Sequence, residues 1–137
     1  MQPPASEAGD KKLPTVLIVD DDPIVRNLAR LALARSGYTA MDANGAAEAE
    51  TLCRNLGSER IDLLIIDHRL PPGVGRHVAE MVLRCFPEAK VLVISGWSYQ
   101  HVQEEDGIPP GSTFLQKPFT PQQLLANVES VLFPSTQ

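Results

Sequence analysis

Five polar side chains that could carry phosphoryl chemistry each follow a short apolar stretch of the sequence. They are Asp20, Asp21, Asp67, Ser95 and Lys117. Three carboxylates brought together repel one another unless a cation lies between them, and an all-oxygen site with few protein ligands suits Mg²⁺. A serine hydroxyl can donate a hydrogen bond to a phosphoryl oxygen, and a lysine ammonium can neutralise charge that the metal leaves. If the fold gathers these groups, they form a phosphoryl-transfer site with a carboxylate nucleophile.

The elements that must position these side chains alternate along the chain between apolar and amphipathic stretches. The apolar stretches are rich in β-branched residues, which is typical of buried parallel strands. Asp22-Pro23 and Thr120-Pro121 each place a capping residue before a proline, which predicts the start of a helix. Strands are expected at residues 15–19, 38–43, 61–66, 91–94 and 113–116. Helices are expected from 23, at about 45–56 and 76–85, in a short form at 98–105, and from 121 to Pro134.

Five strand-helix units with right-handed crossovers predict an α/β fold, a doubly wound parallel sheet covered by helices on both faces. Such a sheet binds ligands in the crevice beyond the carboxyl ends of its strands. Asp20 and Asp21 follow the first expected strand and Asp67 follows the third. Ser95 follows the fourth and Lys117 the fifth. We therefore expect all five side chains to meet in one crevice.

The composition predicts one soluble domain. The chain has 137 residues, of which 43% are hydrophobic and 21% charged, enough for a single core. Residues 1–12 are small and polar and predict a disordered tail or linker, so the domain is expected at 13–134. The net charge of −5 argues against direct nucleic-acid binding. The sequence has no apolar stretch of the roughly 18–20 residues that a span needs and no signal peptide, so we expect no membrane insertion and a cytoplasmic location.

The residues around the predicted crevice resemble the receiver domains of bacterial two-component systems. The resemblance covers residues 13–132 and rests on four motifs in the family's order, which together are highly specific. The motifs are Val-Leu-Ile-Val-Asp20-Asp21-Asp22-Pro, Asp67-His-Arg-Leu-Pro71-Pro-Gly-Val-Gly75, Val-Ile-Ser95-Gly and Phe-Leu-Gln-Lys117-Pro118-Phe. The resemblance implies a flavodoxin-like receiver fold with strand order 2-1-3-4-5.

The resemblance also implies roles for the site residues. Asp67 would be the phosphorylation site, assisted by Lys117 and Ser95. Mg²⁺ would be bound directly by Asp21, Asp67 and the backbone carbonyl of Arg69, and by Asp20 through water.

Further roles follow from the same resemblance. Ser95 and Phe114 would form the coupled switch pair, and the peptide bond between Lys117 and Pro118 would be cis. Arg69 and Trp97 would lie on the rim of the site.

By this resemblance the chain is a signalling switch that takes a phosphoryl group from a histidine kinase or a histidine phosphotransfer protein. It would catalyse only its own phosphorylation and dephosphorylation. Two other functional hypotheses are compatible with the sequence. One is a phosphatase of the haloacid-dehalogenase type with Asp20 as nucleophile, and the other is a receiver-like binding module that works without phosphorylation. A stand-alone regulator and the C-terminal receiver of a hybrid histidine kinase are equally compatible with the sequence.

Overall fold

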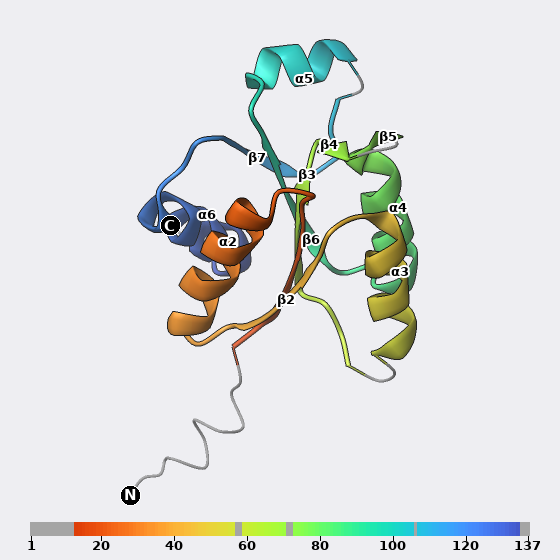
Figure 1. The fold of residues 1–137 in the computed structure, drawn as a ribbon, viewed down its shortest axis with the longest axis vertical. Coiled ribbons are helices and arrows are strands. Elements are labelled where there is room, and N and C mark those ends of the chain that lie inside the picture. The colour runs from red at the N-terminus through yellow and green to blue at the C-terminus, as the bar shows by residue number, and fades with distance from the viewer. Residues whose placement is uncertain (1–12, 57–58, 71–72, 106, 135–137) are drawn as a thin grey trace, which may run out of the picture.

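A five-stranded parallel sheet forms the centre of the molecule in the computed structural model (Figure 1). The structure describes residues 13–56, 59–70, 73–105 and 107–134. The tail expected at 1–12 and Pro71 of the acceptor loop lie outside these ranges. The order β2-β1-β3-β6-β7 is 2-1-3-4-5 when the strands of this sheet are counted along the chain, which confirms the predicted fold. The strands are β1 (Thr15–Val19), β2 (Thr39–Ala43), β3 (Leu63–Asp67), β6 (Lys90–Ser95) and β7 (Thr113–Gln116).

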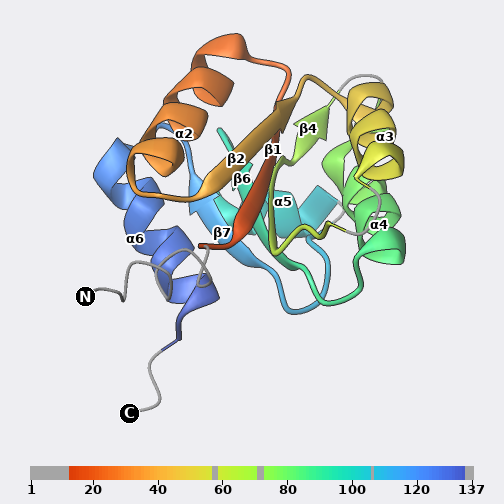
Figure 2. The same ribbon diagram turned by 90° about the horizontal axis from the view of Figure 1, so that it is seen from below.

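Helices cover both faces of this sheet. Figures 1 and 2 show α2 and α6 on one face and α3 and α4 on the other. The short helix α5 stands at the end of the molecule where β6 finishes. The helices are α2 (Pro23–Arg35), α3 (Ala46–Asn55), α4 (Gly75–Cys85), α5 (Tyr99–Glu105) and α6 (Pro121–Leu132). In the part of the chain that the structure describes, no helix has both the length and the apolar character to cross a membrane.

The strands send alternate side chains to two buried clusters because successive residues of a strand point to opposite faces. Leu17 and Leu64 belong to the cluster between the sheet and helices α3 and α4. Ile18 and Ile65 belong to the cluster between the sheet and helices α2 and α6. Apolar burial on both faces explains why the central strands are almost continuously hydrophobic in sequence.

The predicted helix starts at the two Pro-containing sites are confirmed. Asp22 caps α2, its Oδ1 accepting a hydrogen bond from the N–H of Ile24 at 2.9 Å. Thr120 caps α6 in a reciprocal pair with Gln123, in which each side chain accepts a hydrogen bond from the other's backbone N–H. These caps fix where α2 and α6 begin, directly beside the ends of β1 and β7.

Two features differ from the sequence-based expectation. The third strand runs from Leu63 to Asp67 rather than over 61–66, and the fourth ends at Ser95. Backbone hydrogen bonding continues through these polar residues, since the ladder does not depend on side-chain polarity. A two-stranded antiparallel ribbon, β4 (Arg69–Leu70) with β5 (Gly73–Val74), was not predicted. Strands of two residues are too short to show an alternating pattern.

Candidate functional site

The five chemically active residues lie at one edge of the sheet, as predicted. Asp67 and Ser95 are the last residues of the paired strands β3 and β6. Asp20 and Asp21 follow β1 directly, and Lys117 follows β7. Parallel strands bring their carboxyl ends to the same edge, which is where doubly wound sheets bind ligands.

An ion-pair network joins three of these residues, two buried aspartates and the half-buried Lys117. The Nζ of Lys117 lies 2.9 Å from Oδ2 of Asp20 and 3.2 Å from Oδ2 of Asp67. Asp20 is fully buried and Asp67 is 7% exposed. The peptide bond that follows Lys117 and leads to Pro118 is cis, the geometry that the resemblance implied. Lys117 therefore bridges the first and third strands at the point where a phosphoryl group would sit.

The carboxylates of Asp20, Asp21 and Asp67 also form a cluster suited to a hard cation. One oxygen from each lies within 4.8 Å of the others. Asp21 is exposed, whereas the other two are buried. Oxygen donors with access to solvent on one side match the preference of Mg²⁺, which keeps several waters when it binds to proteins. The donor set therefore fits the expected metal.

The electrostatics of this cluster are unbalanced toward negative charge. Burial, and after it the negative charge of Asp20, raise the pKa of Asp67 to about 6, although Lys117 and the N–H of Arg69 oppose the rise. Burial alone would lower the pKa of Lys117, but its contacts with Asp20 and Asp67 outweigh burial and raise it. Both shifts have the sign expected where carboxylates crowd together around one ammonium group.

The loop after Asp67 is held close to the acceptor. The N–H of Arg69 donates to Oδ1 of Asp67 at 3.3 Å, and the N–H of Gly75 donates to the carbonyl of His68 at 2.7 Å. A Cβ atom at Gly75 would collide with the carbonyl oxygen of Asp67. Glycine at this position is therefore required for α4 to begin against the loop that follows Asp67. Metal ligation by the carbonyl of Arg69 stays a prediction.

The proposed switch residues lie on neighbouring strands. Ser95 is buried, and its Oγ accepts a hydrogen bond from the N–H of Trp97 at 3.0 Å. Phe114 lies opposite Val93 in the β6–β7 register and is partly buried against the α3/α4 cluster. Its ring meets the ring of Tyr99 in a T-shaped, edge-to-face contact at a centroid distance of 5.4 Å. Ser95 and Phe114 therefore both adjoin α5, the first through its loop and the second through Tyr99.

The two predicted rim residues stack on each other beside the site. The guanidinium carbon of Arg69 lies 4.7 Å from the centre of the Trp97 ring. The other ring neighbours of Trp97 are His101 at 4.1 Å and His68 at 6.1 Å between centroids. Arg69 also forms an ion pair with Glu105 at 3.9 Å. The contact with Glu105 cannot be predicted from sequence, because residues so far apart along the chain meet only after folding.

A second residue that sequence reasoning missed is Arg26 on α2. Its guanidinium donates to the backbone carbonyl of Asp20 at 2.7 Å and pairs with Asp42 of β2 at 3.2 Å. The N–H of Asp22 donates to Oδ1 of Asp20 at 2.9 Å. These bonds fix both the backbone and the side chain of Asp20. The position of Arg26 one turn into a capped helix was the available signal, but its partners cannot be read from spacing.

Comparison with known proteins agrees with this geometry. The sequence model of the response regulator receiver domain matches residues 16–129. The chain is 30% identical over 124 residues to the transcriptional regulatory protein AruR of Pseudomonas aeruginosa, with 88% of this chain and 50% of AruR covered. It is 30% identical over 118 residues to the sensor kinase CckA of Brucella abortus, with 86% of this chain and 12% of CckA covered.

A solved structure of a response regulator is also similar to this chain. The response regulator TrrA of Thermotoga maritima, crystallised in complex with Mg²⁺ and BeF, superposes with a TM-score of 0.71 at 26% identity. The match covers 88% of this chain and 100% of that structure. The chain spans half the length of AruR and about an eighth of CckA. The likeness to these larger proteins therefore concerns only part of each of them.

Proposed function

The chain belongs to the response regulator receiver domain family, and from this premise we propose that Asp67 accepts a phosphoryl group in a Mg²⁺-dependent reaction. An oxygen of the Asp67 carboxylate attacks phosphorus and forms an acyl phosphate, while the bond between phosphorus and the donor's leaving group breaks. When the donor is a phosphohistidine, the imidazole leaves and takes up a proton. The receiver portion that does this is residues 13–134.

The observation that carries this proposal is the placement of Lys117 between two buried carboxylates. Its Nζ contacts Oδ2 of both Asp20 and Asp67 at 2.9 and 3.2 Å. An ammonium group at this position needs only a small movement to exchange its contact with the Asp67 carboxylate for a contact with an oxygen of a phosphoryl group on Asp67. Phosphoryl transfer depends mainly on positioning and on neutralising charge, and this arrangement supplies both.

The metal would be held by the carboxylates of Asp21 and Asp67 and by the carbonyl of Arg69, with Asp20 contributing through water. Bound Mg²⁺ neutralises the charge that develops on the transferring phosphoryl group. The protein's own contribution is to hold the carboxylates together, which the bonds from Arg26 and from the N–H of Asp22 to Asp20 achieve.

Signal output would begin at Ser95. Its hydroxyl would turn from the N–H of Trp97 toward a phosphoryl oxygen, and Phe114 would move inward behind it. Such a movement biases an equilibrium between two existing conformations. Arg69 and Trp97, which lie side by side at the rim of the site, would limit the access of water to the acyl phosphate by their bulk.

The donor would be a histidine kinase or a histidine phosphotransfer protein. The likeness to the receiver portion of CckA supports a place in a relay that includes a kinase. A haloacid-dehalogenase-type reaction at Asp20 has less support, because Asp20 is fully buried and its carboxylate is engaged by Lys117 and by the N–H of Asp22. A receiver that works without phosphorylation has less support too, because the whole acceptor site is present.

The test is labelling by acetyl phosphate and Mg²⁺, followed by intact mass and peptide mapping. We expect one added phosphoryl group on the wild type, none on Asp67→Asn, and normal labelling of Asp22→Asn. Asp22 is the matched control because it is a neighbouring aspartate that caps α2, and asparagine caps a helix equally well. Labelling that persists in Asp67→Asn and disappears in Asp20→Asn would contradict the proposal and favour the phosphatase.

A further inference from the structure

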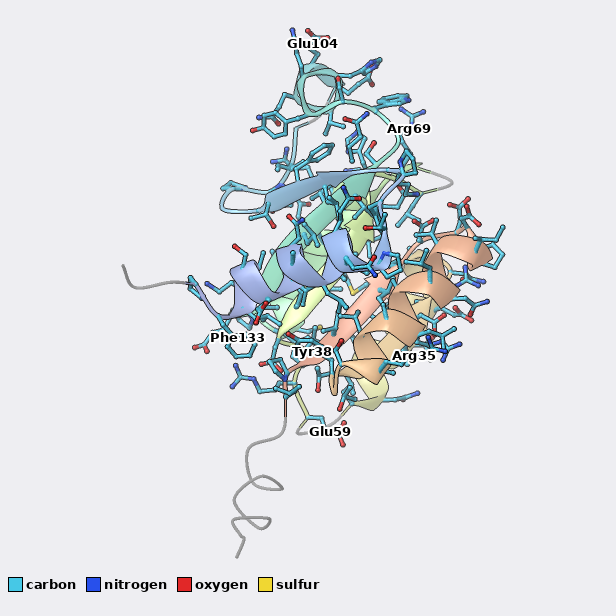
Figure 3. The ribbon with its side chains drawn as sticks, turned by 90° about the vertical axis from the view of Figure 1, so that its left-hand side faces the viewer. Arg35, Tyr38, Glu59, Arg69, Glu104 and Phe133 are labelled. Atoms are coloured by element: carbon cyan, nitrogen blue, oxygen red, sulfur yellow. The ribbon has the colours of Figure 1, made fainter. Side chains whose placement is uncertain are left out.

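Helix α5 is attached to the phosphorylation loop by a line of stacked side chains. Arg69 lies over one ring of this line, Trp97, at 4.7 Å, and Trp97 lies 4.1 Å from the ring of His101 on α5. We call Arg69, Trp97 and His101 the rim stack. Figure 3 shows Arg69 at the same end of the molecule as Glu104 of α5. The rim stack thus links the loop after Asp67 to a helix that stands at the end of the sheet.

The rim stack is anchored to the reaction site by backbone hydrogen bonds at two points. The N–H of Arg69 donates to the carboxylate of Asp67, and the N–H of Trp97 donates to the hydroxyl of Ser95. Those two acceptors are the groups that the proposed phosphorylation changes first. Any change at Asp67 or Ser95 therefore acts directly on the residues that carry the stack.

An ion pair closes the connection between the acceptor loop and α5. Arg69 Nη1 lies 3.9 Å from Oε1 of Glu105, and the two side chains are 54% and 47% exposed. An exposed pair at this distance contributes little to stability and is easily exchanged for a better partner. Glu105 is the last residue of α5, so this contact holds the far end of the helix.

We propose that Arg69 changes partners when Asp67 is phosphorylated: its guanidinium leaves Glu105 for the phosphoryl oxygens, and α5 loses its tether to the acceptor loop. This inference rests on the proposed function of Asp67. In this exchange Arg69 pairs with Glu105 of α5 before phosphorylation and binds the phosphoryl group after it. The exchange also gives α5 a connection to Asp67 through Arg69, in addition to the contact between Phe114 and Tyr99.

The direction of the exchange follows from charge and geometry. A phosphoryl group carries close to two negative charges and three strong acceptor oxygens, whereas Glu105 offers one negative charge at the surface. Arginine binds phosphate oxygens through paired hydrogen bonds, which are stronger than a single ion pair at 3.9 Å. The backbone of Arg69 already touches Asp67, so its side chain needs only to rotate toward the site.

The consequence for α5 follows from how the helix is otherwise held. Val102 is fully buried, and the rings of Tyr99 and Phe114 meet in a T-shaped, edge-to-face contact. These contacts are made within the first four residues of the helix, so removing the Arg69–Glu105 pair loosens mainly the residues that follow Val102. We expect the helix to open more often rather than to unfold.

The experiment is hydrogen exchange of the α5 amides before and after treatment with acetyl phosphate and Mg²⁺, with intact mass measured on the same samples. The variants are Glu105→Gln and the matched control Glu104→Gln. Glu104 lies on the same helix but accepts a hydrogen bond from Gln100 rather than pairing with Arg69. Both variants remove one negative charge from the last turn of α5, and only the first removes the tether.

In the wild type we expect phosphorylation to speed α5 exchange by about two- to fivefold, the range that loss of one exposed ion pair allows. Glu105→Gln should exchange faster before phosphorylation and change little after it, while Glu104→Gln should behave as the wild type. A fully phosphorylated wild type with unchanged α5 exchange would overturn the partner exchange alone. The partner exchange would also be overturned if phosphorylation speeds α5 exchange in Glu105→Gln as strongly as in the wild type. If the mass shows no added phosphoryl group, the proposed function fails and this inference fails with it.

Discussion

The two sides of the reaction site are held in different ways. On the side of α2, the acidic residue Asp20 is fully buried and is fixed by Arg26, Lys117 and the N–H of Asp22. On the side of α5, the contacts are made by side chains that are about half exposed, such as the pair of Arg69 with Glu105. One side is tied by short bonds to a buried carboxylate and its backbone, and the other by contacts at the surface.

Under the proposed function, this difference separates the reaction at Asp67 from the response of α5. Carboxylates that bind a metal and a lysine that binds a phosphoryl group work best when they are already in place, because no reorganisation is then needed during the reaction. A helix that reports the reaction must instead be able to move, and such elements come from the less stable parts of a protein. Under the proposed function, the residues that would meet these two requirements lie on opposite sides of Asp67.

The strongest test of this comparison is to weaken the core under each side. Leu124 of α6 is fully buried in the cluster that also holds α2, so Leu124→Ala should lower the free energy of unfolding by about 2–5 kcal/mol. Val102 of α5 is also fully buried, yet Val102→Ala should mainly increase hydrogen exchange within α5 and shift the global urea midpoint less. Equal shifts of the midpoint in the two variants would show that α5 is as firmly integrated as α6.

The second prediction concerns the repulsion between the carboxylates of Asp67 and Asp20, which Lys117 partly offsets. The pKa of Asp67 is raised to about 6, from about 4 in an unfolded chain. The folded protein therefore binds this proton more tightly than the unfolded chain, and ionising Asp67 in the fold costs stability as the pH rises from about 4 through about 6. We expect Asp67→Asn to be more stable than the wild type by about 1–3 kcal/mol at pH 7.5 in EDTA.

Thermal unfolding at several pH values checks this prediction. The gain should be absent below about pH 4, where Asp67 is protonated in both states. Saturating Mg²⁺ should reduce the gain at pH 7.5, since a bound cation stabilises the wild type's carboxylates. A gain of the same size in acid would mean that packing rather than charge causes it.

Much of this site could be predicted from the sequence because its residues are tied to strand ends. Asp67 and Ser95 close apolar runs of β-branched residues, and Lys117 stands directly before a proline. The doubly wound fold then brings such ends to one edge without any knowledge of side-chain contacts. The helix starts at Asp22 and Thr120 could be predicted equally well, because a capping side chain followed by proline favours a helix start without any tertiary contact.

Contacts between distant side chains could not be predicted in this way. Arg26 reaches Asp20 and Asp42, and Arg69 reaches Glu105, because the fold places them within bonding distance. Periodicity in the sequence does not predict such contacts. The extension of the third strand to Asp67 was missed for a related reason, since hydropathy ended at Ile66 while backbone pairing continued.

The last and smallest effect is expected for Arg26, and it tests whether the α2 side is really organised in advance. Its side chain is 19% exposed and donates to the carbonyl of Asp20 at 2.7 Å. Arg26→Met keeps the apolar stem and removes these donors, which should cost about 1 kcal/mol of stability. Partners that orient metal ligands affect affinity as well, so Mg²⁺ binding should weaken by about tenfold.

The matched control is Arg30→Met, one turn further along α2, where the guanidinium contacts the exposed side chain of Asn27 at 3.2 Å. Chemical-shift titration with Mg²⁺ measures both affinities in the metal-free protein. Arg30→Met should bind as the wild type does, because its donor lies away from the acidic loop. If Arg26→Met also binds normally, the loop is held by Asp22 and Lys117 alone. The two sides of the site would then differ less than their contacts indicate.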